Sequence, residues 1–400
     1  MIESEIKSEK FLERARKRSV DFTRNRKLPF GKLCLFLLGI VHECLSVAFR
    51  RFSEKIGEDI SVTEQSLSEA RDKIRWEAFE ELSEKISDFA YTGGYERWNG
   101  YRVWGVDGTK FALPNYPEAA AYWGDEKGSP TARGSILYDV INYTVFDAQI
   151  ELLSVDERTL AKRHIDALVD RLGIHVDKEL VIYDRGYPSE ELIDYHESNG
   201  LFYLMRVRNK FNLDVDRQES TDGFVQIGRH KVRVIKVTLD TGEIETLLTN
   251  LTGNFDFKEL YFMRWGTEKE YDVLKNTLEI ENFSGRTETA IRQDFHIHVI
   301  ASNMLAASFW EAREIVDEQR NSDNNNKYEY KVNVAQAVSV LRDYLIPAII
   351  ADSPRKRKRL LKKMRTLMAA AFIPVRPNRV VPLNKNNRNT KFHHNRKSNL

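Results

Sequence analysis

The sequence predicts an α/β protein with a mixed sheet, a helical region before it and a helical, basic region after it. Apolar residues recur at helical spacing up to about residue 95. From Tyr101 the pattern changes to short apolar and β-branched segments that alternate with helical ones, as in mixed sheets with buried strands. Residues 209–255 interrupt this order with segments in which apolar and polar residues alternate, so we expect a β-rich insertion there.

The N-terminal region, residues 1–95, is expected to be helical. Two apolar stripes carry this prediction, one from Leu33 to Cys44 and one from Ile74 to Ile86. The first third of the region is also basic. These residues form either a solvated face or a surface for the DNA backbone: Arg14, Arg16, Lys17, Arg18, Arg24, Arg26, Lys27 and Lys32.

Composition excludes several classes of protein. With only two cysteines, Cys34 and Cys44, the chain has neither a disulfide scaffold nor a four-cysteine zinc site. The polar, acidic N-terminus leads us to expect no secretory signal. The longest apolar run, Leu33–Val41, has nine residues, far below the roughly 20 that a membrane-spanning helix needs. We therefore expect a soluble protein of a reducing compartment.

Charge is divided unevenly along the chain. The net charge is only +2, yet residues 354–400 contain 15 Lys and Arg and no Asp or Glu, which leaves 47 basic against 60 acidic residues elsewhere. An acidic body with a basic arm results. The arm is either a solvated tail or a contact for a polyanion, most plausibly nucleic acid.

Two aspartates come directly after predicted core strands. Tyr101–Val106 runs into Asp107, and Leu180–Tyr183 runs into Asp184. The carboxyl ends of strands are where α/β sheets place their ligand sites. Two carboxylates at such an edge repel unless one is protonated or a cation lies between them, and oxygen ligands suit Mg²⁺ or Mn²⁺. Taken singly, each aspartate is also explained as a turn residue or a helix cap.

The other elements follow from the same patterns. We expect further strands at Ile136–Tyr143, Gln149–Val155, Leu201–Val207, Phe224–Ile227, Val232–Leu239 and Ile244–Leu251. We expect further helices at Asp156–Leu172, Glu191–Ser198, Lys258–Leu278, Thr287–Arg320 and Val332–Leu345, with an amphipathic helix at Arg359–Phe372.

Four polar residues share one stripe of the predicted helix Lys258–Leu278. Arg264, Glu268 and Lys275 follow Tyr261 by 3, 7 and 14 residues. At about 100° per residue, these offsets place all four within roughly 60° of arc. Glu268 thus supplies a third carboxylate with two cations beside it. An ordinary surface stripe of helical ion pairs explains the same geometry.

The spacing Tyr261-x2-Arg264-x3-Glu268-x6-Lys275 resembles the Tyr-Arg-Glu-Lys signature of bacterial DDE transposases in the insertion-sequence-four family. Trp265 and Leu274 also look like that family. So do the contexts Val106-Asp107-Gly108-Thr109 and Tyr183-Asp184-Arg185-Gly186-Tyr187, which resemble its two aspartate boxes. Thr267 departs from the family, in which an aliphatic residue commonly precedes the glutamate. The resemblance extends over most of residues 20–310.

The resemblance implies a ribonuclease H-like core in which Asp107, Asp184 and Glu268 hold two divalent cations, Mg²⁺ or Mn²⁺. Catalysis would be hydrolysis at the ends of a mobile element followed by strand transfer into target DNA. The terminal inverted repeats would be contacted by Tyr261, Arg264 and Lys275. Trp265 is either a base-stacking wedge or a core residue.

The resemblance also implies a homodimer in the synaptic complex and a bacterial, cytoplasmic, nucleoid-associated protein with no membrane partner. We expect a DNA-binding region at 1–95, a catalytic core at 96–310 with the insertion at 209–255, and a C-terminal region at 311–400. A catalytically inactive DNA-binding regulator of transposition is the alternative from another class. A stand-alone metal nuclease of the same fold is a third possibility.

Overall fold

The computed structural model describes residues 1–24, 26–39, 44–126, 129–172, 178–239, 241–322, 326 and 328–376. The chain forms two compact units. Unit 1 comprises Met1–Ile86, Ala112–Thr131 and the described part of Val273–Leu400, and unit 2 comprises Ser87–Phe111 and Ala132–Asp272. The division at residues 95 and 310 expected from sequence stays a prediction.

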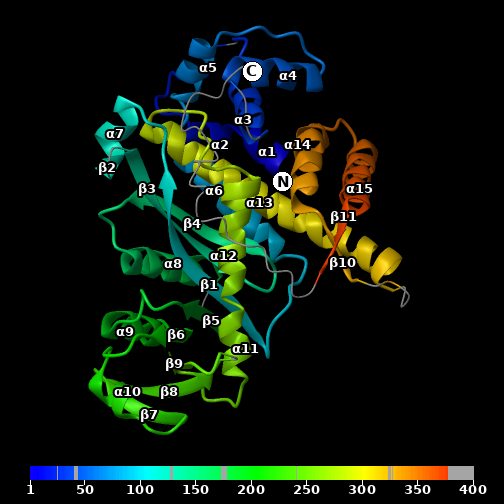
Figure 1. The fold of residues 1–400 in the computed structure, drawn as a ribbon. Helices are drawn as coiled ribbons and strands as arrows, with labels where there is room; N and C mark the ends of the chain where they lie inside the picture. The colour runs from blue at the N-terminus through cyan, green and yellow to red at the C-terminus, as the bar shows by residue number, and fades with distance from the viewer. Residues whose placement is uncertain are drawn as a thin grey trace. The chain divides into compact units, whose positions relative to one another are not determined.

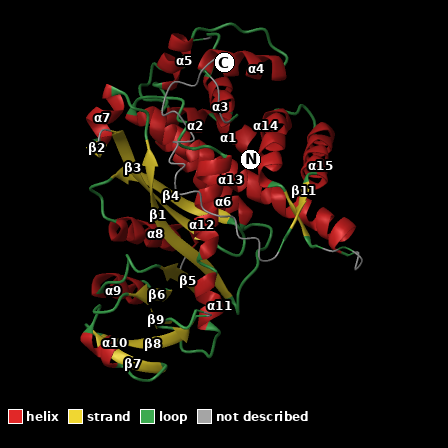
Figure 2. Cartoon of the chain, in the orientation of Figure 1, coloured by secondary structure: helices red, strands yellow, loops and turns green. Residues whose placement is uncertain are grey.

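Unit 1 is mainly helical (Figures 1 and 2). Its N-terminal helices are α1 (Ile2–Ile6), α2 (Glu9–Ala15), α3 (Phe30–Leu38), α4 (Leu45–Lys55), α5 (Glu64–Arg71) and most of α6 (Glu77–Ala90). Its later helices are α7 (Pro117–Trp123), the π-helix η1 (Val273–Thr277), α13 (Glu288–Val316), the π-helix η2 (Asp317–Asn321), α14 (Val334–Ile349) and α15 (Pro354–Ala370). A short antiparallel pair joins β10 (Tyr330–Val332) to β11 (Phe372–Pro374), and β2 (Asp125–Glu126) pairs with Ser129 and Pro130.

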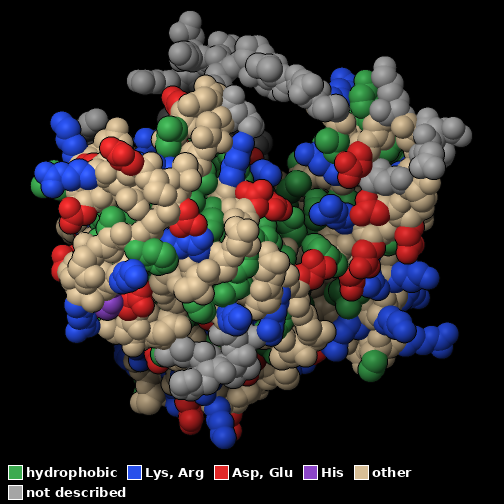
Figure 3. Space-filling model, turned by 90° about the horizontal axis from the view of Figure 1, so that it is seen from below, with side chains coloured by type: hydrophobic (Ala, Val, Ile, Leu, Met, Phe, Trp, Pro, Cys, Tyr) green, Lys and Arg blue, Asp and Glu red, His purple; other side chains and the backbone are tan. Residues whose placement is uncertain are grey.

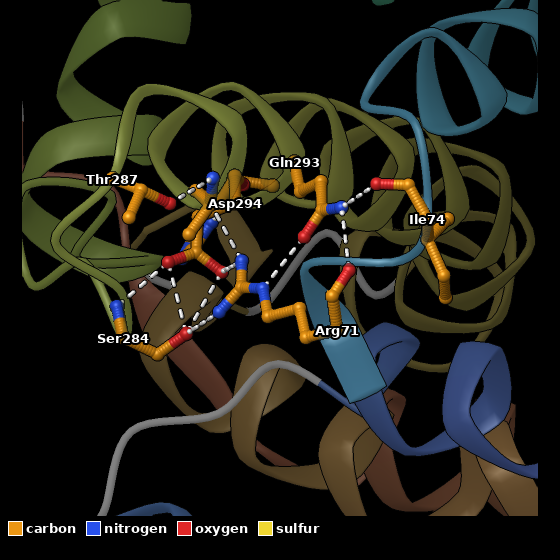
Figure 4. Close-up of polar contacts among 8 residues, drawn as sticks. Arg71, Ile74, Ser284, Thr287, Gln293 and Asp294 are labelled. Carbon is orange, nitrogen blue, oxygen red and sulfur yellow. Dashed lines mark hydrogen bonds and ion pairs between the residues drawn. The ribbon is translucent and has the colours of Figure 1, made fainter. Parts of the chain in front are cut away.

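Helix α13 is the centre of unit 1. It is buried along most of its first half and contacts α3, α7, α14 and α15. Arg71, the last residue of α5, ties the N-terminal helices to it (Figure 4). The Arg71 guanidinium donates to Gln293 Oε1 at 2.6 Å and to Asp294 Oδ1 at 2.8 Å, and it reaches Ser284 Oγ at 2.6 Å. These buried contacts explain why segments from both ends of the chain form one unit.

The basic helix α15 is partly neutralised within unit 1. Arg357 donates to Glu3 Oε2 at 2.6 Å, and Arg365 pairs with Glu311. The apolar side of the helix buries Met364 and Met368, as an amphipathic helix requires. The basic arm predicted from sequence is therefore in part a packed helix, and residues 377–400 lie outside the described part of the chain.

Unit 2 is built on a mixed sheet. Its strands are β1 (Tyr101–Ala112), β3 (Ser129–Asp139), β4 (Thr144–Leu152), β5 (Lys178–Tyr183), β6 (Phe202–Val207), β7 (Asp222–Ile227), β8 (His230–Thr238) and β9 (Ile244–Thr249). Its helices are α8 (Glu157–Leu172), α9 (Glu190–Ser198), α10 (Leu213–Arg217), α11 (Phe257–Phe262) and α12 (Trp265–Asp272). The strand order is β3-β1-β5-β6-β9-β8-β7, and β4 pairs with β3.

Different helices pack on the two faces of this sheet. Helices α8 and α9 pack on one face, where the core contains Trp104, Val106 and Tyr183 (Figure 1). Helix α12 packs on the other face, so closely that a Cβ on Gly105 would lie 2.1 Å from Thr267 Oγ1. Because side chains alternate along a strand, Asp107 points to the same face as Gly105.

The α/β fold class, the mixed sheet and the β-rich insertion predicted from sequence are confirmed. Strands β7, β8 and β9 of the insertion continue the main sheet through β6. Four expectations were wrong in detail. Strand β1 runs on past Asp107 to Ala112, and Lys258–Leu278 is three segments rather than one helix. The strand expected at Ile136–Tyr143 is Ser129–Asp139, and the strand expected at Gln149–Val155 is Thr144–Leu152. No helix among the described residues is long and apolar enough to cross a membrane.

Candidate active site

Asp107 and Asp184 lie at the carboxyl end of a parallel strand pair. Strands β1 and β5 pair in parallel from Tyr101 and Lys178 up to Val106 and Tyr183. Each aspartate is therefore the residue immediately after the last registered pair. The sequence placed Asp107 at the end of its strand; β1 continues, but its parallel pairing with β5 ends there, so the two carboxylates still occur side by side.

Hydrogen bonds fix the backbone of Asp107 from two elements. Tyr271 Oη on α12 donates to the Asp107 carbonyl at 2.8 Å, and Ser135 Oγ on β3 donates to it at 3.3 Å. Ser135 is itself 2.9 Å from His164 Nε2, and His164 Nδ1 is 2.5 Å from Asp147 Oδ2. Ser135 and His164 are fully buried, so this Ser-His-Asp chain is closed to a substrate and serves to position the strand.

Asp184 is surrounded by donors. Tyr261 Oη donates to Asp184 Oδ1 at 3.0 Å, and Arg206 Nη1 lies 3.9 Å from the same oxygen. Burial alone would raise the pKa of Asp184. The Arg185 amide, the charge of Arg264 and the Tyr261 hydroxyl outweigh burial, so its pKa is lowered and the carboxylate is ionised at neutral pH.

The pKa of Asp107 is shifted in the opposite direction to that of Asp184. The pKa of Asp107 is raised from 3.8 to about 6, chiefly by burial and also by the charges of Glu268 and Asp184, against the Gly108 amide and the Arg264 charge. The charge of Glu268 acts on Asp107 because α12 packs on the face to which Asp107 points. Two aspartates on adjacent strands therefore differ in protonation near pH 6, the pattern expected when carboxylates crowd one site.

The four polar residues predicted to share one stripe of one helix, Tyr261, Arg264, Glu268 and Lys275, lie in a helix that is interrupted. Between α11 and α12 the amides of Arg264, Gly266 and Thr267 bond to carbonyls three residues back, which is a tighter turn than the α-helix. After α12 the chain widens into the π-helix η1, where the Leu278 amide bonds to the Val273 carbonyl five residues back. The 100° spacing assumed from sequence is thus kept neither before nor after α12.

The tight turn brings Arg264 to Glu268. Arg264 Nη2 donates to Glu268 Oε1 at 2.8 Å, and the buried guanidinium lies 5.6 Å from the centre of the Tyr261 ring. Tyr261, Asp184 and Glu268 raise the pKa of Arg264 more than its burial lowers it, so it is permanently charged. Arg264 therefore compensates the carboxylates of the site. Its Nε is buried without a hydrogen-bond partner among the described residues.

Trp265 and Lys275, the other two residues predicted to contact DNA, lie in different surroundings from each other. The Trp265 side chain is 50% exposed, which excludes the core-residue interpretation and leaves its indole accessible. Lys275 lies in η1, which belongs to unit 1, and is half-buried. On the face of the protein in Figure 3, basic and acidic side chains are interspersed, with no large surface of one sign.

The carboxylates of Asp107, Asp184 and Glu268 are chemically suitable ligands for a divalent cation, but their arrangement in this structure is not that of a metal site. Among the residues that the structure describes, no three His, Cys, Asp or Glu side chains are arranged to hold a metal ion. Asp107, Asp184 and Glu268 nevertheless form an oxygen-only donor set whose charges oppose one another, which is the chemistry that Mg²⁺ or Mn²⁺ stabilises. To become a ligand, Glu268 has to exchange Arg264 for the cation.

Three residues that hold the site were not identified from sequence. Tyr271 follows Glu268 by three residues, a helical spacing that would have indicated a neighbour on the same face. Ser135 and Arg206 lie on β3 and β6, and no local pattern links them to the aspartates. Thr267, noted as unusual in the sequence, packs on Gly105, and its Oγ1 is buried without a partner among the described residues.

A family model described as "Transposase DDE domain" matches residues 98–304, just over half of the sequence, and this range contains all three carboxylates. No curated protein matches the chain. A cryo-EM structure of a piggyBac transposase synaptic complex with hairpin DNA is similar, with 8% sequence identity, a TM-score of 0.47, and coverage of 92% of this chain and 84% of that one.

Proposed function

Because this chain belongs to the transposase DDE domain family, we propose that it is an active DNA transposase whose catalytic residues are Asp107, Asp184 and Glu268. It binds the terminal inverted repeats of its mobile element, cleaves the phosphodiester at each end and joins the ends to target DNA. We also infer the finer assignment suggested by the Tyr-Arg-Glu-Lys spacing, namely a ribonuclease H-like transposase of the bacterial insertion-sequence-four family that acts in the cytoplasm on nucleoid DNA.

The observation that supports this proposal is that two aspartates follow adjacent parallel strands and that the charge of a third carboxylate acts on one of them. Asp107 and Asp184 follow the last pair of β1 and β5, and the Glu268 charge raises the pKa of Asp107 from the neighbouring helix. Such a donor set would hold two divalent cations, Mg²⁺ or Mn²⁺, which supply activation of the attacking hydroxyl and stabilisation of the leaving oxygen. Asp184 is ionised before a cation arrives, whereas Asp107 has to lose its proton near pH 6.

The basic and aromatic residues of the signature have distinct roles in this proposal. Trp265, the half-exposed first residue of the helix that carries Glu268, stacks on a base of the transposon end. Arg264 and Tyr261 hold Glu268 and Asp184 until DNA and cations bind, and their hydrogen bonds then turn to a phosphate. Lys275 contributes a phosphate contact. Two chains act together, since two ends are joined.

The second candidate is a DNA-binding regulator that does not cleave. The complete carboxylate set and the hydrogen bonds that hold Asp107 favour the enzyme, because a protein that only binds DNA has no use for a buried aspartate with a raised pKa. The regulator is therefore an outcome of the test below.

The test uses a plasmid that carries the gene's native flanking DNA around a marker. Excision and insertion are scored with the wild type and with Asp184→Ala in the presence of Mg²⁺, and binding to the end sequence is measured separately. Asp194→Ala is the matched control, since Asp194 is another ion-paired aspartate of unit 2. We expect joined products with the wild type and the control, and binding without products with Asp184→Ala. Binding without cleavage by the wild type would identify the regulator.

A further inference from the structure

Helix α15 of unit 1 presents a basic face to solvent. Its sequence contains eight Lys and Arg residues and no Asp or Glu. The helix packs against α13 and α14 and lies beside α14 in Figure 1. Its buried residues are Met364, Met368 and Ala369. The opposite side is exposed and contains six of the eight cations.

Four of the eight cations have a partner within unit 1. Arg357 and Arg365 form the ion pairs with glutamates that are described above. Lys356 Nζ lies 3.3 Å from Asp352 Oδ2, and Lys363 Nζ lies 5.4 Å from the centre of an aromatic ring on α14. The fold therefore neutralises or covers the cations at the margins of the basic side.

The other four cations share the centre of the exposed side. Their side chains form neither an ion pair nor a hydrogen bond within the described part of the chain, and all four are exposed: Arg355, Lys358, Arg359 and Lys362. The last three follow the first by 3, 4 and 7 residues, which at about 100° per residue places all four within about 100° of arc. We call these four residues the outer face of α15.

This arrangement is unfavourable for the helix on its own. Like charges one turn apart repel, and the outer face contains four such pairs at spacings of three or four residues. Cations near a helix N-terminus also oppose the helix dipole, and α15 has no acidic residue in its first turn. A polyanion bound along the outer face would relieve both effects.

We propose that the outer face of α15 binds the phosphate backbone of duplex DNA through charge, without reading the bases. The inference rests on the proposed function for the identity of the polyanion. From Arg355 to Lys362 the helix rises about 10 Å, and duplex DNA carries one negative charge per about 1.7 Å of its axis. About six phosphates thus lie along a length that presents four cations.

Two observations favour DNA at this surface. A helix that binds a membrane inserts its apolar side, whereas the apolar side of α15 buries Met364 and Met368 inside unit 1. The chain outside residues 354–400 has 47 basic and 60 acidic residues, a net charge of −13. Most of the protein therefore repels a polyanion, and the field of the chain directs DNA to the basic C-terminal region.

The experiment titrates the full chain against a labelled DNA duplex that is unrelated to the element's ends, at salt concentrations from 50 to 200 mM. Binding is followed by fluorescence anisotropy. We expect the pair Arg359→Gln and Lys362→Gln to reduce the slope of log binding constant against log salt by about 1.8, because each phosphate contact contributes about 0.9. Binding at 100 mM salt should weaken by about tenfold or more.

The matched control is the pair Lys356→Gln and Arg365→Gln. It removes one Lys and one Arg from the same helix, but both have acidic partners within unit 1. Residues 377–400 are the same in every variant, so their contribution to binding cancels. We expect the control pair to change the slope by less than half as much as the outer pair. In urea, the outer pair should unfold at the same or a higher concentration than the wild type, since it removes repulsion.

Equal loss of binding with both pairs would show that only net charge matters and would overturn the inference. Destabilisation of the fold by the outer pair, or tighter binding of duplex RNA than of duplex DNA by the same face, would overturn it as well. The proposed function fails separately. Excision by the wild type with unchanged DNA binding by the outer pair refutes this inference alone, whereas loss of binding by the outer pair without excision by the wild type refutes the transposase alone.

Discussion

Asp107 and Asp184, the two aspartates proposed as catalytic, are expected to affect folding stability with opposite signs. Asp107 has its pKa raised from 3.8 to about 6 in the folded protein, chiefly by burial. Between these values the folded state holds a proton that the unfolded state has released, so the free energy of unfolding falls as pH rises from about 4 to about 6. A shift of about two units corresponds to at most about 3 kcal/mol at pH 7.5.

Asp107→Asn removes the free-energy cost of ionising Asp107 in the folded protein. The amide keeps the size of the side chain, and its oxygen still accepts the Gly108 amide that bonds to Asp107 Oδ1 at 2.9 Å. Without divalent cations, we expect Asp107→Asn to be more stable than the wild type at pH 7.5 by on the order of 2–3 kcal/mol, and equal to it near pH 4. Residues of functional sites commonly lower the folding stability of a protein in this way.

Asp184→Asn is expected to behave in the opposite way. The lowered pKa of Asp184 means that its ionised form stabilises the folded state above its unfolded pKa, and that this contribution is lost as pH falls through the folded value. Asp184→Asn is therefore less stable than the wild type at pH 7.5, and the difference shrinks in acid.

The assay is urea unfolding in EDTA at pH 4 and pH 7.5, followed by fluorescence of tryptophans such as the buried Trp104 of unit 2. Asp170→Asn, an exposed position on α8, controls for the loss of one negative charge. Destabilisation by Asp107→Asn at pH 7.5, or a gain that is the same at both pH values, would refute the electrostatic reasoning. Mg²⁺ is expected to restore stability to the wild type and not to Asp107→Asn.

Three further predictions concern packing and DNA contact. Arg71→Ala removes the ion pair of the buried Asp294, so we expect a loss of about 3–5 kcal/mol in the free energy of unfolding, measured in urea. Gly105→Ala forces a methyl group onto Thr267 and should cost about 1–3 kcal/mol, which Thr267→Ala should largely recover in a double-mutant cycle. Trp265→Ala should change stability by less than about 0.5 kcal/mol, because the side chain is half exposed, yet weaken end binding in a gel-shift titration; unchanged binding would exclude its stacking role.

Local pattern was sufficient to predict most of the secondary structure and to propose residues for the site. Strand periodicity located β5, β6 and the three strands of the insertion, and helical periodicity located α8 and α13. Position after a strand identified Asp107 and Asp184, and spacing along the chain identified Glu268. The tight turn before α12 and the π-helix after it were not predicted, because each depends on where buried side chains such as Arg264 find a partner.

By itself, the sequence was enough to propose three carboxylates for the site, since strand ends, helical spacing and the resemblance to a transposase signature are properties that can be read along the chain. Tertiary structure alone decided their electrostatic states and their supports. Burial separates the pKa of Asp107 from that of Asp184, and Tyr271, Ser135 and Arg206 reach the aspartates from three other elements. Desolvation and close approach depend on which distant segments pack together, and no local pattern encodes that.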